Sequence, residues 1–250
     1  MITSAKYSML HPPLVERIYN EEKDEKKVKT RLHQMFGAYV QGNAHKKTAH
    51  LLNELEAGRD AKDVSTEILQ LHASSKERSA FLQSFHDFIY GHAGEAETML
   101  DLGCGFNPFS IPLLPYNIKE YHAYDIDTRT RDLLNRFMRQ LNLPQLAHCA
   151  DLAVETPTQT IDLAFMCKLV PVLEMQQPGR GFELARQLNA KFLVITYPLK
   201  SLGGRNKGMG KNYAAQFENA HAAGKFGNYE PVGEREIGNE LAYILKRSTL

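Results

Sequence analysis

Thr98-Met-Leu-Asp-Leu-Gly-Cys-Gly105 is the stretch that decides the fold of this 250-residue chain. Its apolar residues Met99, Leu100 and Leu102 predict a buried strand that runs into two glycines. A sharp turn after a strand, or a ligand that comes close to the backbone, favours glycine because no Cβ intervenes. The same pattern is typical of an ordinary strand-to-helix turn, so it does not indicate a ligand by itself.

A second strand-like run, Tyr121 to Tyr124, ends in Asp125, twenty residues after Gly105. A carboxylate at the tip of the next strand is suited to bind the two hydroxyls of a ribose. The dinucleotide fingerprint needs a third glycine, and Phe106 to Pro108 supply none. The D-x-G-x-G pattern instead resembles motif I of the class I methyltransferases. It therefore favours S-adenosylmethionine over a dinucleotide as the cofactor.

Composition and charge exclude several classes of protein. The chain is 43% hydrophobic with a net charge of +1, and it has neither an apolar run that could span a membrane nor a signal-peptide core. Its three cysteines form no C-x-x-C pair, so neither a disulfide framework nor a zinc site is predicted. We therefore expect a cytoplasmic protein without a metal and without a membrane partner.

The chain has a helical part followed by an alternating part. Residues 1–95 carry apolar side chains at helical spacing, which predicts a helical subdomain. In residues 96–250, strands and helices alternate, which predicts an α/β domain with a mostly parallel sheet. The expected strands are 98–103, 119–125, 145–149, 160–167, 191–197, 226–232 and 240–246. The expected helices are 45–56, 62–72, 75–91, 128–141, 179–188 and 212–223.

Ligands bind beyond the carboxyl ends of the strands in such sheets. Gly103, Gly105 and Asp125 lie at this edge of the expected sheet, and so does Asp151, which follows the third expected strand. The carboxylate of Asp151 can accept a hydrogen bond from an adenine amino group. It can equally well cap the helix or turn that follows.

Positive charge is concentrated in two segments of this almost neutral chain. Residues 1–50 hold nine Lys or Arg against five Asp or Glu, and residues 200–216 hold four cations and no acid. Two such segments predict a phosphate-binding face. Each of them alone is just as typical of a solvated surface.

Two longer motifs are far more specific than the glycine turn, because a generic methyltransferase needs neither. They are His72-Ala-Ser-Ser-Lys-Glu-Arg78 and Ser201-Leu-Gly-Gly-Arg205. With Asp101 to Pro108, Lys168 to Glu174 and Ile237 to Leu241, they resemble the aminoglycoside-resistance methyltransferases that modify guanine N7 in the decoding site of 16S rRNA. The resemblance covers most of the chain. It implies a class I, Rossmann-like α/β fold with a seven-stranded sheet and an N-terminal helical subdomain that recognises RNA.

The resemblance also implies an S-adenosylmethionine pocket and its residues. Arg78 would pair with the cofactor carboxylate, as a guanidinium fork can do with two hydrogen bonds. Gly103 would line the methionine part and Asp125 would bind the ribose, while Asp151 and Leu152 would contact the adenine. The remaining pocket positions are Tyr39, His72, Ala73, Ser74, Cys167 and Gln176.

The implied substrate is 16S rRNA in the assembled small (30S) ribosomal subunit, and the implied outcome is aminoglycoside resistance. We expect the protein to act as a monomer. Guanine N7 has a lone pair and no proton, so no residue is named as an acid or base, and catalysis depends on proximity and orientation. Lys168 and Arg205 are candidates for contacts near the target base. The RNA-binding candidates are Lys29, Arg31, Lys200, Arg205, Lys207 and Lys211.

Three other functions fit parts of the pattern. A class I methyltransferase of a protein or small molecule would share the glycine turn and Asp125. A noncatalytic RNA-binding protein would keep the basic segments but not bind the cofactor. An adenine N1 methyltransferase of the neighbouring decoding-site nucleotide would give a different primer-extension stop and a different resistance spectrum. The specificity of the two longer motifs favours guanine N7.

Overall fold

The structure, a computed structural model, describes residues 7–37, 42–200 and 208–248. The α-helices are α1 (Pro12–Glu22), α2 (Glu25–Leu32), α3 (Ala44–Glu56), α4 (Ala61–Leu69), α5 (Ala73–Ser79), α6 (Leu82–Ala93), α7 (Thr128–Gln140), α8 (Val170–Gln176), α9 (Arg180–Gln187) and α10 (Met209–Ala222). A π-helical turn, η1 (His33–Gly37), and a 3-10 helix, η2 (Asn107–Leu113), complete the helical elements of these residues. The strands are β1 (Thr98–Leu102), β2 (Glu120–Asp125), β3 (Ala147–Cys149), β4 (Thr160–Cys167), β5 (Asn189–Pro198), β6 (Tyr229–Ile237) and β7 (Glu240–Arg247).

The described strands form a seven-stranded sheet in the order β3-β2-β1-β4-β5-β7-β6. The pairs β2–β3, β1–β4 and β4–β5 are parallel, whereas β7 is antiparallel to both β5 and β6. Residues 163–166 of β4 and 193–197 of β5 are all buried, as is typical of strands that are covered on both faces. The expected α/β fold with a mostly parallel seven-stranded sheet is therefore confirmed.

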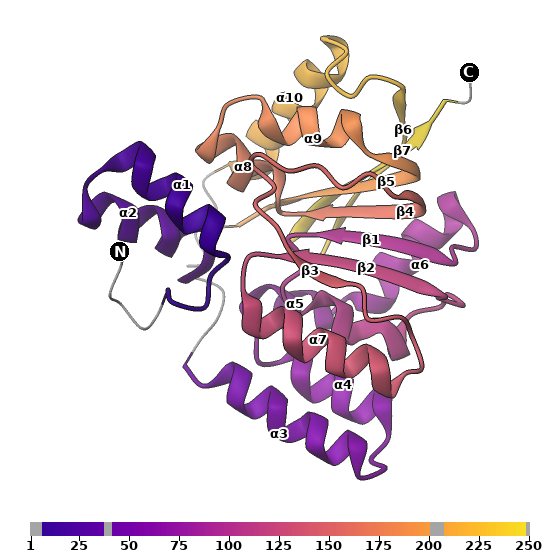
Figure 1. Ribbon diagram of the computed structural model, residues 1–250. Helices are drawn as coiled ribbons and strands as arrows, with labels where there is room; N and C mark the ends of the chain where they lie inside the picture. The colour runs from indigo at the N-terminus through magenta and orange to yellow at the C-terminus, as the bar shows by residue number, and fades with distance from the viewer. Residues whose placement is uncertain (1–6, 38–41, 201–207, 249–250) are drawn as a thin grey trace. The chain divides into compact units, whose positions relative to one another are not determined.

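The fold divides into two compact units. The first comprises the described parts of residues 1–79, 103–114 and 120–151, and the second comprises those of residues 80–102, 115–119 and 152–250. In the first unit, α3 packs against α4 and α7, and α7 packs against β2 and β3 (Figure 1). In the second unit, α8 and α10 pack against β5, and α6 packs against β6.

The glycine turn leads into η2, not into the long α-helix that follows a dinucleotide fingerprint. Pro108 stands at the start of η2 and Pro112 inside it, and a proline has no N–H to donate to an α-helical hydrogen bond. The side chains of Phe106 and Phe109 are fully buried beside the turn, and α4 packs against η2. Apolar packing therefore fixes the turn, and the short η2 stands where a dinucleotide fingerprint would have a long α-helix.

The helix pair α1–α2 is anchored to the residues that follow β2. Its apolar core consists of Tyr7, Leu10, Leu14, Ile18, Val28, Leu32 and Phe36, and Ile126 packs against it. Two backbone hydrogen bonds add to this packing, from His11 N–H to the carbonyl of Ile126 at 2.8 Å and from Thr128 N–H to the carbonyl of Met9 at 2.9 Å. The helix pair is therefore attached directly after Asp125.

The expected single helix over residues 75–91 is wrong, because α5 and α6 occupy this range separately. Phe81 stands between them with φ −135° and ψ 19°, which is not helical. Its ring lies so close to Gly238 that a Cβ there would overlap it. Packing between distant residues therefore breaks a helix that the local apolar spacing predicts to be continuous.

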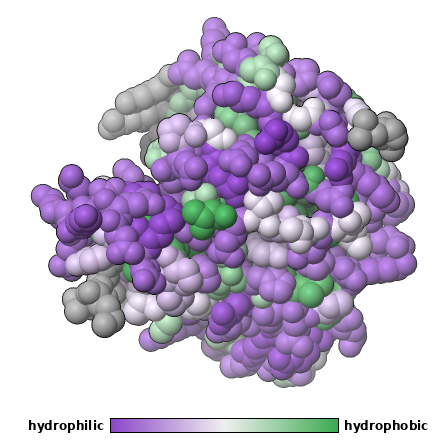
Figure 2. All heavy atoms as spheres, turned by 45° about the horizontal axis from the view of Figure 1, so that its top comes forward, coloured by the Kyte–Doolittle hydropathy of each residue, from purple (hydrophilic) through white to green (hydrophobic). Residues whose placement is uncertain are grey.

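None of the helices in the described ranges has the length and apolarity needed to cross a membrane. The face drawn in Figure 2 is mostly hydrophilic, and its apolar areas are small and separate. Scattered apolar side chains of this kind are normal for a protein surface. Among the residues that the structure describes, the exposed large apolar side chains are Met9, Tyr19, Tyr90, Val154, Met175 and Val232.

Candidate active site

The glycine turn and Asp125 are in direct contact. The N–H of Gly105 donates to Oδ2 of Asp125 at 2.8 Å, and the N–H of Cys104 donates to the carbonyl of Tyr124 at 3.0 Å. Gly103 and Gly105 have φ of 65° and 50°, a left-handed conformation that favours glycine. The two segments expected at one edge of the sheet are thus hydrogen-bonded to each other.

Three backbone N–H groups anchor the carboxylate of Asp125. Oδ1 accepts from Ile126 and Asp127 at 2.7 and 3.0 Å, and Oδ2 accepts from Gly105. A carboxylate oxygen accepts about two hydrogen bonds, so Oδ2 has a position left for a donor such as a ribose hydroxyl. Burial raises the pKa of Asp125, while the three N–H groups act against this rise because they stabilise the charged form.

The segment from His72 to Arg78 lies against the glycine turn. The ring of His72 stacks on Phe106 with 5.1 Å between centroids, and a Cβ on Gly105 would lie 2.9 Å from Cε1 of His72. Arg78 is 3% exposed, and its Nη1 donates to Oδ1 of Asn107 at 3.0 Å. A guanidinium has five N–H groups in a planar fork, which is the geometry that binds a carboxylate through two hydrogen bonds. The segment and the turn therefore form one continuous site, with Ala73 and Ser74 half-buried at the start of α5.

Asp151 forms an ion pair with Arg17 of α1. Nε of Arg17 lies 2.6 Å from Oδ2 and Nη2 lies 3.1 Å from Oδ1, so both oxygens are engaged. Burial lowers the pKa of Arg17, but hydrogen bonds to Asp151 and Glu21 outweigh this effect and raise it. The sequence analysis missed Arg17, because 134 residues separate the two partners and no motif connects them.

A second buried carboxylate, Asp127, joins α3 to α7. Nε2 of His45 lies 2.8 Å from Oδ2 of Asp127, which is fully buried. Asp127 also caps α7 by accepting from the N–H of Arg129, whose side chain pairs with it. Burial acts to raise the pKa of Asp127, but the bonds to His45 and Arg129 outweigh this effect and lower it. His45 was also missed, since nothing in its local sequence indicates a partner.

The other pocket candidates belong to the second unit. Leu152 is 5% exposed, and its carbonyl accepts a hydrogen bond from Nε of Arg180 at 2.9 Å. Cys167 is the last residue of β4 and is half-buried. Gln176 is the last residue of α8, and its Nε2 donates to the carbonyl of Val172 at 3.5 Å. Cys167 thus stands at the carboxyl end of β4, where the sequence predicts that the ligand binds, and Gln176 ends the helix that follows this strand.

Lys168 is held at the end of β4 by its backbone and by a buried ion pair. Its φ of 56° is uncommon for a residue with a side chain, and its N–H donates to the carbonyl and to Oγ1 of Thr196 at 3.0 and 3.1 Å. Nζ lies 3.4 Å from Oε1 of Glu240, and the two side chains are 10% and 0% exposed. Strained residues of this kind cluster at functional sites. The role of Glu240 was missed, although the sequence placed it within a motif.

The RNA-binding candidates on α2 already have acidic partners within the protein. Nζ of Lys29 lies 2.7 Å from Glu25, and Nη1 of Arg31 lies 2.7 Å from Glu21 and 2.9 Å from Glu22. Exposed pairs of this kind contribute about 0–1 kcal/mol each, so a phosphate can compete for these cations. Lys200 and Lys211 are exposed. The candidates that lie outside the described residues are Tyr39, Arg205 and Lys207.

The donor set of the first unit fits S-adenosylmethionine. It contains a buried guanidinium at Arg78 and two carboxylates at Asp125 and Asp151, which are the residue types that the sequence analysis expects at the carboxylate, the ribose and the adenine. A dinucleotide would need the N-terminus of a long helix after the glycine turn, where η2 stands instead. In the described ranges, no group of three or more His, Cys, Asp or Glu side chains could hold a metal ion.

Comparisons with known proteins show the family to which the chain belongs. Residues 3–244 match the family described as Ribosomal RNA methyltransferase (FmrO). The chain is 35% identical to a 16S rRNA (guanine(1405)-N(7))-methyltransferase of Serratia marcescens, over 99% of this chain and 96% of the relative. The solved structure of the 16S rRNA methyltransferase RmtF in complex with S-adenosyl-L-homocysteine is similar with a TM-score of 0.86 and 32% identity, over 99% of this chain and 95% of that one. The 16S rRNA methylase RmtB is similar with a TM-score of 0.81 and 30% identity, over the same shares of the two chains.

Proposed function

Since the chain belongs to the ribosomal RNA methyltransferase (FmrO) family and is an S-adenosylmethionine-dependent 16S rRNA (guanine-N7) methyltransferase, we propose that it modifies a decoding-site guanine in the assembled 30S subunit. The observation that carries this proposal is the 35% identity, over nearly the whole of both chains, to the Serratia marcescens enzyme, whose name gives guanine 1405 as its target. The target of this chain would be the corresponding guanine. The expected outcome in a cell is resistance to aminoglycosides of the 4,6-disubstituted deoxystreptamine type.

The first unit supplies the side chains that would bind and orient the cofactor. Arg78 would pair with its carboxylate, Oδ2 of Asp125 would accept from its ribose, and Asp151 would accept from its adenine amino group. The bare backbone of Gly103 allows close approach of the methionine part. When bound, S-adenosylmethionine provides a methyl group on a positively charged sulfur, which is a strong electrophile.

The acceptor atom needs no proton transfer, because guanine N7 has a free lone pair. The protein has to hold N7, the methyl carbon and the sulfur in line, which is catalysis by proximity and orientation. N7 lies in the deep, narrow major groove of an RNA helix, so the base must be exposed or flipped at a cost of about a few kcal/mol. Contacts of cations on α2 and in residues 200–211 with phosphates would offset this cost. Lys168, fixed by Glu240, and Arg205 stay our candidates for contacts near the target base.

We assign RNA recognition to the helical residues 1–95 and methyl transfer to residues 96–250, with two exceptions: Arg78 would bind the cofactor, and the cations in residues 200–211 would bind RNA. The protein would act as a monomer in the cytoplasm, where its ribosomal substrate is found. The chemistry supports a reaction without a metal, since a sulfonium methyl is already activated and N7 needs no deprotonation.

Methyl transfer to purified ribosomal particles tests the proposal. The protein is incubated with labelled S-adenosylmethionine and with 30S subunits, naked 16S rRNA or 70S ribosomes, and label in the RNA is counted. We expect transfer to 30S subunits above the other two. Label that enters naked rRNA equally well, or that enters ribosomal protein, contradicts the proposal.

A matched pair of variants separates cofactor binding from RNA binding. Asp125→Asn should lower transfer about 10- to 100-fold, because a hydrogen bond to a charged group contributes about 1.5–3 kcal/mol. Its affinity for 30S subunits should be unchanged. Asp132→Asn is the control, since the Asp132 side chain on α7 is 66% exposed. Full activity of Asp125→Asn would exclude this residue from the cofactor site.

A further inference from the structure

We propose that His45 of α3 is a positioning residue that fixes the direction of the Asp125 carboxylate, because it bridges the two segments that hold this carboxylate. The inference rests on the role of Asp125 at the ribose that is proposed above. His45 acts through Asp127 and Phe106, and not through a contact of its own with the cofactor.

The carboxylate of Asp125 is held by two segments that are far apart in the sequence. Oδ2 accepts from the N–H of Gly105 in the glycine turn, and Oδ1 accepts from the N–H groups of Ile126 and Asp127, which follow β2. A shift of one segment against the other would turn the carboxylate, since a hydrogen bond weakens steeply as its angle departs from linear. The direction of Oδ2 therefore depends on how firmly the two segments are joined.

The side chain of His45 contacts both segments. Its Nε2 lies 2.8 Å from Oδ2 of Asp127 and 3.1 Å from Oγ1 of Thr130. Its ring meets that of Phe106, the residue after Gly105, in an edge-to-face arrangement with 5.8 Å between centroids. Aromatic rings favour this arrangement. One side chain from α3 therefore joins the glycine turn to the residues that follow β2.

The contact between His45 and Asp127 is shielded from water. The Asp127 side chain is fully buried, and the His45 side chain is 11% exposed. Arg129, which also bonds to this carboxylate, is 37% exposed, and its Nε lies 3.2 Å from Oδ1. Hydrogen bonds and charges interact more strongly away from water. Arg129 also belongs to the same segment as Asp127 and moves with it, so His45 supplies a restraint from outside that segment.

Helix α3 is a firm support for this side chain. It packs against α4 and α7. Near the other end of α3, Oε2 of Glu56 lies 2.6 Å from Nη2 of Arg136 on α7. Since Asp127 caps α7, α3 is attached to α7 near both of its ends. The backbone of His45 is therefore held in place by the whole helix.

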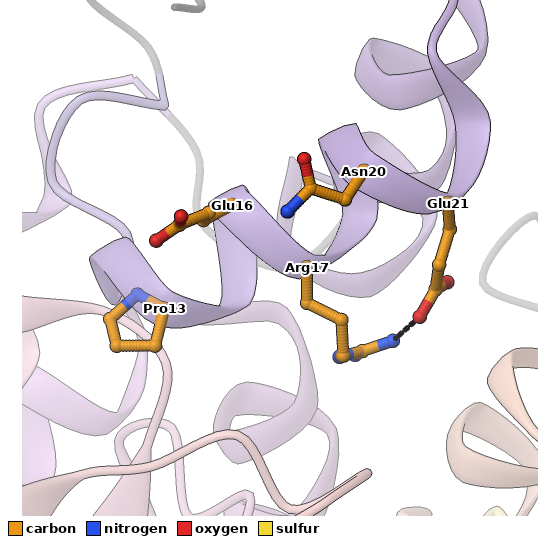
Figure 3. Close-up of a pocket in the computed structure, with 5 residues that line it drawn as sticks. All are labelled: Pro13, Glu16, Arg17, Asn20 and Glu21. Carbon is orange, nitrogen blue, oxygen red and sulfur yellow. Dashed lines mark hydrogen bonds and ion pairs between the residues drawn. The ribbon is translucent and has the colours of Figure 1, made fainter.

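The helix pair α1–α2 holds the same segment in a different way. Backbone hydrogen bonds and the packing of Ile126 connect it to residues 126–128. Polar side chains of α1 border an open depression of about 480 Å³, where Figure 3 shows Arg17 turned toward Glu21. The helix pair thus holds the backbone of this segment, and His45 holds its buried carboxylate.

A carboxylate with a fixed direction recognises a ribose by its hydroxyl groups. A hydroxyl donates best when the acceptor oxygen lies in line with its O–H bond. If Asp125 can turn, a ligand with ribose hydroxyls loses this hydrogen bond, whereas a ligand without them has no such bond to lose. Removal of the His45 side chain should therefore change the preference between two such ligands, in addition to any change in the affinity for both.

Isothermal titration calorimetry with two ligands tests the inference. The probes are S-adenosylhomocysteine and its dideoxyribose counterpart, which lacks both ribose hydroxyls, and the quantity compared is the ratio of their dissociation constants. We expect wild type to prefer S-adenosylhomocysteine by about 10- to 100-fold, as is typical of a hydrogen bond to a charged group. His45→Ala should reduce this preference about 5-fold. A smaller folded fraction would weaken both ligands equally, so an unchanged ratio in His45→Ala overturns the inference.

Two further variants keep the test decisive. His45→Gln loses the ring but retains a side-chain N–H that can donate to Asp127, so its ratio should lie closer to that of wild type than to that of His45→Ala. His50→Ala is the control, because His50 lies on the same helix and pairs with Glu54 but is 75% exposed, and it should leave the ratio at the wild-type value. A ratio in His45→Gln as low as in His45→Ala, or a changed ratio in His50→Ala, counts against the inference.

Asp125→Asn distinguishes a failure of this inference from a failure of the proposed function. If Asp125→Asn loses the preference and His45→Ala keeps it, the ribose contact stands and only the role of His45 is wrong. If Asp125→Asn keeps the full preference, the proposed ribose contact is wrong and the inference falls with it.

Discussion

Replacing Gly105 by alanine probes whether the glycine turn and the His72 segment form one rigid site. Gly105 has φ of 50°, and a Cβ there would lie 2.9 Å from Cε1 and 3.1 Å from Nε2 of His72. His72 has little room to withdraw, because it is 6% exposed and stacked on Phe106. The substitution therefore adds a backbone cost and a packing cost at the same point.

Each cost has a known scale. A left-handed backbone costs an alanine roughly 1–2 kcal/mol, and moving the His72 ring away from its preferred rotamer costs about 0.5–1.5 kcal/mol. We expect the free energy of unfolding to fall by about 2 kcal/mol, which for a chain of this length lowers Tm by roughly 4–8 °C. The hydrogen bond from Gly105 to Asp125 would shift as well. Affinity for S-adenosylhomocysteine should therefore fall about 10-fold, equivalent to about 1.4 kcal/mol.

Substitutions at two other glycines separate the backbone cost of Gly105→Ala from its packing cost, when all variants are compared by thermal unfolding and calorimetry. Gly224 has φ of 66° with nothing within 4 Å of where a Cβ would stand, so Gly224→Ala has only the backbone cost and should lower Tm by a few degrees. Gly91 lies inside α6 with open space around it, so Gly91→Ala should raise stability by up to about 1 kcal/mol. If Gly105→Ala unfolds at the Tm of Gly224→Ala and binds S-adenosylhomocysteine as wild type does, the contact with His72 has no role.

Three further predictions follow from buried charge and from the basic segments. Burial acts to raise the pKa of Asp162, but hydrogen bonds outweigh burial and lower the pKa to about 2. The ionised carboxylate therefore stabilises the fold above about pH 4, and this stabilisation is lost as the pH falls toward 2. In urea unfolding at pH 7, the free energy of unfolding of Asp162→Asn should be lower than that of wild type by roughly 2 kcal/mol. A difference between the two free energies that stays constant down to pH 3 contradicts this prediction. Lys168→Met should lower the free energy of unfolding by about 3 kcal/mol, and adding Glu240→Gln should raise it again by at least about 1 kcal/mol. If the effects of the two substitutions on the free energy of unfolding simply add, the two side chains are not coupled. Replacing Arg205 and Lys207 by alanine should reduce the slope of log K against log salt for 30S binding by about 1–2, and an unchanged slope removes both from the RNA interface.

The local sequence pattern was sufficient to predict two of the strands that lead into the candidate site. The expected strand 160–167 coincides with β4, and the expected strand 119–125 with β2 to its last residue, Asp125. The second half of β4 is apolar up to Lys168, and the strand-like run Tyr121 to Tyr124 of β2 ends in Asp125, so the ends of both strands are encoded locally. The expected strand 226–232 is displaced, because β6 runs from Tyr229 to Ile237 with a bulge between Pro231 and Gly233. A bulge disturbs the alternation on which the prediction depends.

The partners of the buried charges could not be predicted in this way. Arg17 and Asp151 are 134 residues apart, and Lys168 and Glu240 meet only because β7 folds back beside β5. Such pairs depend on tertiary packing, which leaves no periodic signal in the sequence. The position of Asp151 after an expected strand and the resemblance to a family made Asp151 and Lys168 candidates, but neither revealed what holds these side chains in place.

The identity of the methylated nucleotide decides whether the proposed target is right. Purified 30S subunits are treated with the protein and S-adenosylmethionine, and nuclease fragments of the 16S rRNA are analysed by mass spectrometry. We predict a single N7-methylguanosine, at the decoding-site guanine that corresponds to the target named for the Serratia marcescens relative. N1-methyladenosine at the neighbouring nucleotide, or unmodified 16S rRNA from protein that binds S-adenosylhomocysteine, would contradict it.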